Sequence, residues 1–519
     1  MNKLLFLLLT FTCIVGCKKI EHPKKTTPLK VNFLSDPATL DPRKAADFVT
    51  ATLQFYICEG LTRCIPSAVA ANGLAKEISI SENRLVYTFK LRNTKWSDNT
   101  PLTSYDFAKS WTSTLDPNFL APNAFLLYPI LNAQKAKEGL CPLSDVGIAT
   151  PDSKTLIITL HTPTPPFLEM ISFCSLFPIQ ANLEHDSIGS NSIGPYTISE
   201  YKQGNYLRLK KNPNYWDAKN VTLQEIYITL VQDEMTAYQM YELGELDFIG
   251  TPFSSIPTEI ATELRKTEQF HTQALCGTTF ISFNLKHPPF SNYNFRQAIF
   301  HSIDKQVLVQ KVTQLGDSIA HGMVPPKLYD SKHLSVEYPN PKLAKIFLKL
   351  AQKELDYTIE DFNNLTLYFT NNDILSKVAP IIQNQIFENL GIQLKIRPFS
   401  HPILMHNLTT KTYDIAICSC FAQYYDPLNI LERFNQENSM KNYPSFHDDN
   451  FSAILDSSHY IKDKKQRKLS LSTAEQILIE NRAVIPLYHP KSTYMYKPTV
   501  YNIQSNPTGG IYLNQVEKK

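Results

Sequence analysis

The stretch GPYTISEYKQGNYLRLKKNPNYWDAKNVTLQEIYITLVQDEMTAYQMYELGELD, residues 194–247, decides the fold. Apolar and polar residues alternate on both sides of the turn at 203–205, which is the pattern of a half-buried β-hairpin. The apolar run 226–231 has the length of a strand. Residues 234–245 then carry apolar side chains at helical spacing, and Gly244 marks the end of the helix. The stretch therefore predicts two strands, a turn, a third strand and a helix.

The length of the chain predicts more than one packed unit, and its charge argues against a nucleic-acid partner. The chain has 519 residues, which exceeds one ordinary hydrophobic core and implies two or more packed units. Hydrophobic residues make up 43% of the chain and are ample for burial. The net charge is only +3, and aromatic residues are not interleaved with basic runs. No nucleic-acid partner is therefore expected.

The N-terminus predicts export and a lipid anchor. Lys3 supplies a positive flank, and the apolar segment 4–15 is too short to span ~30 Å of hydrocarbon as a helix. Gly16 and Cys17 follow, and the whole resembles a bacterial lipoprotein signal, in which residues 1–16 are removed and Cys17 carries acyl chains. The alternative is an ordinary signal peptide with a chance cysteine. Residues 17–28 read as a flexible tether, which predicts a lipid-anchored protein of the periplasm or cell surface.

The cysteines give no clear metal site. Besides Cys13 in the signal and Cys17, seven remain, an odd number at irregular spacing: Cys58, Cys64, Cys141, Cys174, Cys276, Cys418 and Cys420. The pair Cys418 and Cys420 is a weak metal signal, and buried free thiols beside the apolar run 415–417 are the preferred interpretation. No metal and no cofactor is predicted.

The remaining pattern indicates α/β lobes. Strands are expected at 29–34 and 87–92, and a helix from Ser104, where Asp106 in the first turn suits the helix dipole. Trp96, Phe107 and Trp111 could form a ligand cage, but at this spacing a small core is preferred. In the later half, apolar runs alternate with helical stretches, which argues for an α/β sheet. The runs lie at 280–284, 365–370, 392–396 and 413–418, and the helices at 295–308, 342–354, 374–390 and 472–481.

Separate motifs along the chain carry a family resemblance. They are GPY at 194–196, NPNYWD at 212–217, GELD at 244–247, FN at 283–284, PPF at 288–290, RQA at 296–298 and ID at 303–304. In this order they are similar to the extracellular solute-binding proteins that feed peptide ABC importers. The resemblance spans nearly the whole mature chain.

This resemblance implies an α/β fold of the periplasmic-binding-protein type, with two lobes joined by a hinge. The implied divisions are a first lobe at 29–61, 185–272 and 485–519, a subdomain inserted into it at 62–184, and a second lobe at 273–484. It also implies a monomer that binds a peptide between the lobes and signals to its permease in the cytoplasmic membrane by hinge closure.

The resemblance further implies a ligand site at 422–427. In the family an Asp of this segment pairs with the ligand's α-ammonium, and here Gln423 stands in its place. Tyr424 and Tyr425 follow. Asp426 keeps the second acidic position, where capping of the next helix is preferred over ligand contact. Asp36 is a further acid that could hold the ammonium.

A disulfide is implied as well, because family members often join the strand before the FN and PPF block to the strand that leads to the ligand acid. Here Cys276 occupies the first place approximately, and Cys418 or Cys420 the second.

Local catalytic signatures do not occur in the sequence, which has no G-x-S-x-G, H-E-x-x-H, Walker loop or G-x-G-x-x-G. A binding protein rather than an enzyme is therefore expected. Alternatives to a peptide ligand are a muropeptide, nickel, haem or a sugar. A surface lipoprotein or adhesin without a transport role is the alternative from another class.

Overall fold

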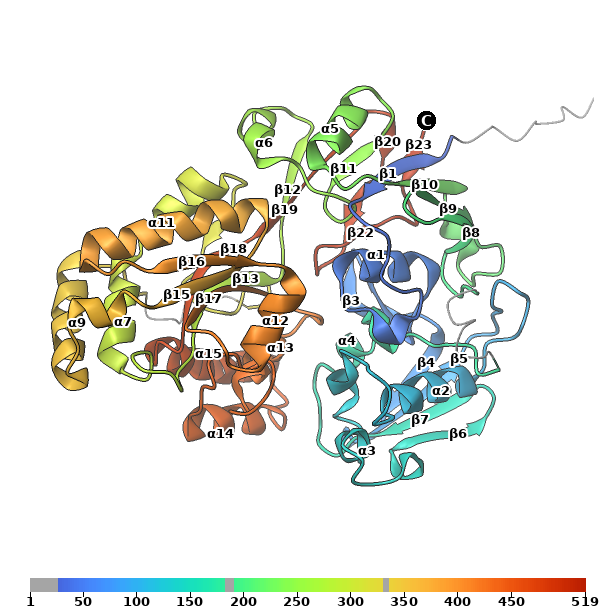
Figure 1. Ribbon diagram of the computed structural model, residues 1–519. Coiled ribbons are helices and arrows are strands. Elements are labelled where there is room, and N and C mark those ends of the chain that lie inside the picture. The colour runs from blue at the N-terminus through green and yellow to red at the C-terminus, as the bar shows by residue number, and fades with distance from the viewer. Residues whose placement is uncertain (1–26, 183–190, 330–335) are drawn as a thin grey trace, which may run out of the picture.

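The computed structural model describes residues 27–182, 191–329 and 336–519. Figure 1 shows two lobes side by side, one built largely from the first half of the chain and the other from the second half. The strands β12 (Phe270–Ala274) and β19 (Lys491–Tyr496) pair antiparallel and run from one lobe towards the other. The predicted two-lobe α/β architecture is confirmed.

The deciding stretch folds as its pattern predicts. It contains the hairpin strands β8 (Tyr196–Lys202) and β9 (Tyr206–Lys211), the strand β10 (Glu225–Leu230) and the helix α5 (Glu234–Glu242). The hairpin turn holds Gly204 at a φ of 69°, which glycine adopts without steric cost. With β1 (Leu29–Phe33) these strands form a sheet in the order β1-β10-β9-β8, in which β1 is parallel to β10.

A second sheet of the first lobe has the order β4-β5-β7-β6. Its strands are β4 (Ala75–Ile80), β5 (Val86–Leu91), β7 (Thr155–Thr159) and β6 (Ile148–Asp152). The helix α2 (Ser104–Thr114) packs on β6 and β7 and begins at Ser104, with Asp106 in a capping box as expected at a helix N-terminus. Phe107 and Trp111 are fully buried in this lobe's core. The preferred interpretation of these aromatic residues as core is therefore confirmed.

The second lobe is a six-stranded sheet covered by helices on both faces. The order is β14-β18-β13-β17-β15-β16, with β14 (Ser318–Ile319), β18 (Val484–His489), β13 (Gly277–Phe283), β17 (Ile415–Phe421), β15 (Thr366–Thr370) and β16 (Lys395–Phe399). One face carries α7 (Tyr293–Ser302), α9 (Pro341–Leu355) and α11 (Asp373–Leu390). The other carries α12 (His401–Thr409), α14 (Asp449–Ser458) and α15 (Lys464–Glu480).

Two boundaries differ from the prediction. The strand β18 pairs with β13 in the second lobe, with Ile485 opposite Ile281, so the chain returns to the first lobe after His489 rather than after Val484. The helix α15 begins at Lys464 rather than Ser472, because Asp463 caps it by accepting the N–H of Gln466.

Further helices and strands complete the two lobes. The helices are α1 (Phe48–Ile57), α3 (Ala133–Lys137), α4 (Phe167–Met170), α6 (Thr258–Leu264), α8 (Lys305–Val307), α10 (Ile359–Phe362) and α13 (Leu428–Leu431). The strands are β2 (Thr62–Ile65), β3 (Ala68–Asn72), β11 (Phe248–Gly250), β20 (Val500–Tyr501), β21 (Gln504–Ser505), β22 (Ile511–Tyr512) and β23 (Glu517–Lys518). Within the described ranges, none of the helices has the length and apolarity needed to cross a membrane.

Candidate functional site

The two lobes touch where β17 ends, at the segment predicted to bind the ligand. The side-chain amide of Gln423, in the second lobe, donates to Asn123 Oδ1 in the first lobe at 2.7 Å. Asn123 is itself held by its own lobe, because its Nδ2 donates to Ala45 O at 2.8 Å and to Ser175 Oγ at 2.9 Å. The backbone N–H of Gln423 donates to Asn429 Oδ1 at 2.9 Å. Gln423 therefore joins the lobes through two fixed partners.

Gln423 also keeps an unused acceptor. Its Oε1 is buried and finds no hydrogen-bond partner among the described residues. A buried carbonyl oxygen without a donor costs free energy, which a ligand N–H or a water molecule would recover. The predicted anchor position is thus a neutral acceptor at the boundary between the lobes.

Tyr424 makes a second contact between the lobes. Its side chain is 1% exposed and lies in the core cluster of the first lobe, although its strand belongs to the second. Its hydroxyl donates to Glu432 Oε1 at 2.9 Å. Burial raises the pKa of Glu432 to about 7, and the bond from Tyr424 opposes that rise. The Tyr424 side chain is therefore buried between the lobes and packs against the first one.

Lys441 makes a third such contact. Its Nζ lies 3.0 Å from the centroid of the Phe125 ring, which belongs to the first lobe two residues after Asn123. Burial lowers the pKa of Lys441 to about 6, and the charge of Arg433 acts in the same direction. A cation over an aromatic face is attracted by the ring quadrupole, so this contact favours closed lobes when Lys441 is protonated, below about pH 6.

Asp426 is bound within its own lobe. Its two carboxylate oxygens accept from Arg467 Nη1 at 2.6 Å and from Arg467 Nη2 at 3.0 Å. Oδ1 also accepts the N–H of Leu428, the first residue of α13, at 2.9 Å. The expected contact with a helix N-terminus is therefore present, with Pro427 just before the helix rather than in its first turn. Arg467 lies 41 residues away in the chain, and no local pattern predicts this ion pair.

The other two predicted residues lie elsewhere. Asp36 accepts the Tyr201 hydroxyl at 2.8 Å and the Gly204 N–H at 3.0 Å, which ties it to the turn between β8 and β9. The hydroxyl of Tyr425 donates to Lys327 O at 2.5 Å. The structure thus brings Gln423 and Tyr424 to the first lobe and places Asp36 at the hairpin.

Electrostatic effects also cross the lobe boundary. Glu169 of α4 is in the first lobe, and burial raises the pKa of its carboxyl. The negative charge of Asp426 raises that pKa further, whereas the charges of Lys464 and Arg467 lower it. All three of these charged residues belong to the second lobe.

The predicted disulfide is absent. Cys276, Cys418 and Cys420 are all buried free thiols. The register between β13 and β17 explains this, because Cys418 lies opposite Phe280, and Cys420 lies opposite Thr278. Cys276 lies one residue before β13 begins, and its carbonyl accepts the Ala422 N–H at 2.7 Å. No two of these cysteines face each other across the ladder.

The described part of the chain has no candidate metal site. Within residues 27–182, 191–329 and 336–519, no group of three or more His, Cys, Asp and Glu side chains is arranged to hold a metal ion. Cys17 lies outside the described residues. The described contacts can close the two lobes reversibly through a neutral hydrogen bond, packing and, where Lys441 is protonated, its ammonium over the Phe125 ring.

Comparison with known protein families gives one match that covers most of the chain. Residues 70–442 match the model described as bacterial extracellular solute-binding proteins, family 5 Middle. The oligopeptide-binding protein OppA of Bacillus subtilis is 30% identical over 95% of this chain and 93% of its own length. The dipeptide-binding protein DppE of the same organism is 28% identical over 97% of this chain and 96% of its own.

Solved structures show the same architecture. A periplasmic oligopeptide-binding protein of Borrelia burgdorferi, OppAIV, superposes with a TM-score of 0.84 at 26% sequence identity. The match covers 95% of this chain and 99% of that one. The similarity therefore extends over both lobes and the strands that join them.

Proposed function

Because the chain belongs to the bacterial extracellular solute-binding proteins of family 5, we propose that it captures oligopeptides between its lobes and delivers them to an ABC permease in the cytoplasmic membrane. The observation that carries the proposal is the bond from Gln423 to Asn123, since it lies at the predicted ligand segment and forms only when the lobes are together. The choice of ligand is supported by the oligopeptide-binding and dipeptide-binding relatives, which match this chain over 93% and 96% of their own lengths.

The peptide main chain supplies most of the recognition in this proposal. Extended peptides bind through backbone hydrogen bonds in the manner of an added strand, and water-filled pockets tolerate varied side chains. The free Gln423 Oε1 is one acceptor that a peptide N–H or terminal amine would use. Gln423 brings no charge, and Asp426 is already paired with Arg467, so selection for a free N-terminus is weak.

Export and anchoring complete the proposal. Residues 1–16 act as a lipoprotein signal, Cys17 carries the lipid, and the tether 17–28 holds a monomeric body at a bacterial membrane. The division into a first lobe, an inserted subdomain at 62–184 and a second lobe is part of the same proposal, with the return to the first lobe placed after His489.

Small-angle scattering tests the closure on which the proposal depends. The radius of gyration should fall when a saturating mixture of short peptides is added to protein freed of ligand by unfolding and refolding. A profile that stays open at saturation would contradict hinge closure. Peptide binding measured in parallel by calorimetry distinguishes a rigid binding protein from one that does not bind peptides.

A further inference from the structure

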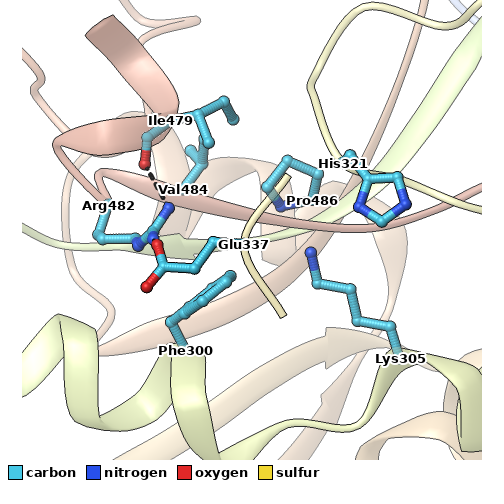
Figure 2. Close-up of a pocket in the computed structure, with 8 residues that line it drawn as sticks. All are labelled: Phe300, Lys305, His321, Glu337, Ile479, Arg482, Val484 and Pro486. Carbon is cyan, nitrogen blue, oxygen red and sulfur yellow. Dashed lines mark hydrogen bonds and ion pairs between the residues drawn. The ribbon is translucent and has the colours of Figure 1, made fainter. Parts of the chain in front are cut away.

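The second lobe contains a small cavity that lies apart from the contacts between the lobes. Its walls come from α7, α8, the end of α15 and β18, and include Phe300, Lys305, His321 and Arg482. Figure 2 shows the Lys305 side chain reaching from its helix towards His321 and Pro486. None of these residues takes part in the Gln423, Tyr424 or Lys441 contacts described above.

Lys305 is a buried amine with few partners, one of which is the Phe300 ring, whose centroid lies 5.4 Å from Nζ. Lys305 is only 6% exposed, and its Nζ donates to Ala320 O at 3.1 Å. Ala320 O is the one hydrogen-bond acceptor that the described residues offer to this ammonium, although an ammonium carries three donors. Buried charges are ordinarily paired. Lys305 thus lacks a counter-ion within the described part of the chain.

The nearby carboxylate does not fill this role. Glu337 is paired with Arg482 Nη2, and its Oε1 lies 3.2 Å from His301 Nε2. Arg482 uses its other donors on Gln297 Oε1 at 3.2 Å and on Ile479 O at 2.9 Å. Two cations therefore line the cavity beside one carboxylate, and that carboxylate is bound to Arg482.

We propose that this cavity binds one small monovalent anion, of the size of chloride, between Lys305 Nζ and the His321 ring. The ammonium provides a charge-assisted hydrogen bond, and Phe300, Val484 and Pro486 form the apolar part of the wall beside it. The free space is about the size of a single water molecule. A space of that size leaves room for nothing larger than a monatomic ion, so phosphate and the carboxylate of a peptide are excluded.

Anion binding at this place is coupled to protonation. Burial, and to a lesser extent the charge of Arg482, lowers the pKa of Lys305 to about 7. Burial also lowers the pKa of His301 and the pKa of His321. Burial lowers the pKa of His489, close by on β18, to about 4. Lys305 is thus the group whose protonation an anion would favour most. The anion should therefore bind more tightly below pH 7 and more weakly above it.

Crystals grown in sodium bromide test the site directly. An anomalous peak is expected between Lys305 Nζ and His321, and it should vanish in Lys305→Met, in which the buried cation is removed. Lys345→Met, on the exposed side of α9, is the matched control and should keep the peak. A cavity without bromide in the native protein would overturn the proposal, and so would a peak that persists in Lys305→Met.

A solution measurement on the native protein covers the case in which Lys305→Met does not fold. The pKa of the Lys305 ammonium, followed by NMR, should be about one unit higher in sodium chloride than in sodium gluconate of equal ionic strength, which requires at least tenfold tighter binding to the protonated form. Sodium phosphate should give the gluconate value. An equal rise in phosphate would contradict a small-anion site, and no rise in chloride would contradict any anion site.

Discussion

Gln423 of the second lobe and Asn123 of the first lie 300 residues apart in the chain and are joined by a hydrogen bond of 2.7 Å. Both side chains are neutral, and such a bond contributes about 0.5–1.5 kcal/mol. That magnitude favours closed lobes without locking them, which suits a protein that must release its ligand. Gln423 occupies the position at which the resembling family has an Asp that pairs with the ligand's α-ammonium.

The neutral anchor predicts how the protein treats the ligand's N-terminus. N-acetylation of a short peptide should cost the native protein less than about 1.4 kcal/mol of binding free energy, a tenfold change. Gln423→Asp restores a carboxylate and should raise that discrimination above tenfold, because a charge-assisted bond is about twice as strong as a neutral one. Calorimetry on matched free and acetylated peptides measures both values. If the native protein rejects the acetylated peptide by a hundredfold, a group other than Gln423 holds the amine.

The ion pair of Asp426 and Arg467 should contribute strongly to stability. Asp426→Asn leaves the Arg467 guanidinium, 7% exposed, without its carboxylate and should lower the free energy of unfolding by about 3–5 kcal/mol. Urea unfolding measures the change. Glu263→Gln is the control, because its ion pair with Lys266 is exposed and should cost less than about 1 kcal/mol. Equal losses in the two variants would show that burial of the Asp426 pair has no effect.

Glu475 of α15 predicts a pH dependence. Its side chain is fully buried, Oε1 accepts the Val324 N–H at 2.7 Å, and Oε2 has no partner among the described residues. Burial raises its pKa from 4.5 to about 8. The folded state therefore holds this proton more tightly than the unfolded state, so stability decreases as the pH rises from 4.5 to 8 and the full penalty is present above 8.

Glu475→Gln removes this penalty while keeping the oxygen that accepts from Val324. The variant should have the same free energy of unfolding as the native protein near pH 4. At pH 9 its free energy of unfolding should be higher by a few kcal/mol, because each unit of a pKa shift corresponds to about 1.4 kcal/mol. Thermal unfolding across this pH range measures the difference. Glu480→Gln, at an exposed position of the same helix, should show no such trend. A constant difference between Glu475→Gln and native protein at all pH values would refute the assignment.

The proposed lipid anchor is tested by Cys17→Ser. The body should remain folded but move from the detergent phase to the aqueous phase, because each acyl chain contributes about 0.8 kcal/mol per buried methylene. Phase partition followed by immunoblotting reads this out. A serine variant that stays in the detergent phase would mean that another segment holds the protein at the membrane.

Much of the fold could be predicted from local pattern. The hairpin at 196–211 and the helices α9 and α11 follow from alternation and helical spacing, which depend on neighbouring residues only. The position of β18 could not be predicted in this way. Its six residues are buried throughout, so the pattern does not say which lobe's sheet they join, and pairing with β13 decides it.

The site was less predictable for the same reason. A motif identified Gln423 and Asp426, but their partners Asn123 and Arg467 come from distant parts of the chain and carry no local signal. The predicted disulfide failed on register, because one position along the β13 and β17 ladder decides whether two thiols can meet. Lys441 and Phe125 likewise meet only because the lobes fold against each other.

Native mass spectrometry of the protein, purified after export and incubated with a mixture of short peptides, tests the central claim most directly. Capture of peptides between the lobes predicts one bound mass per protein, drawn from several sequences and identified as peptides by fragmentation. Bound haem, nickel or sugar in place of peptide would contradict the account, as would a protein that stays empty in the peptide mixture.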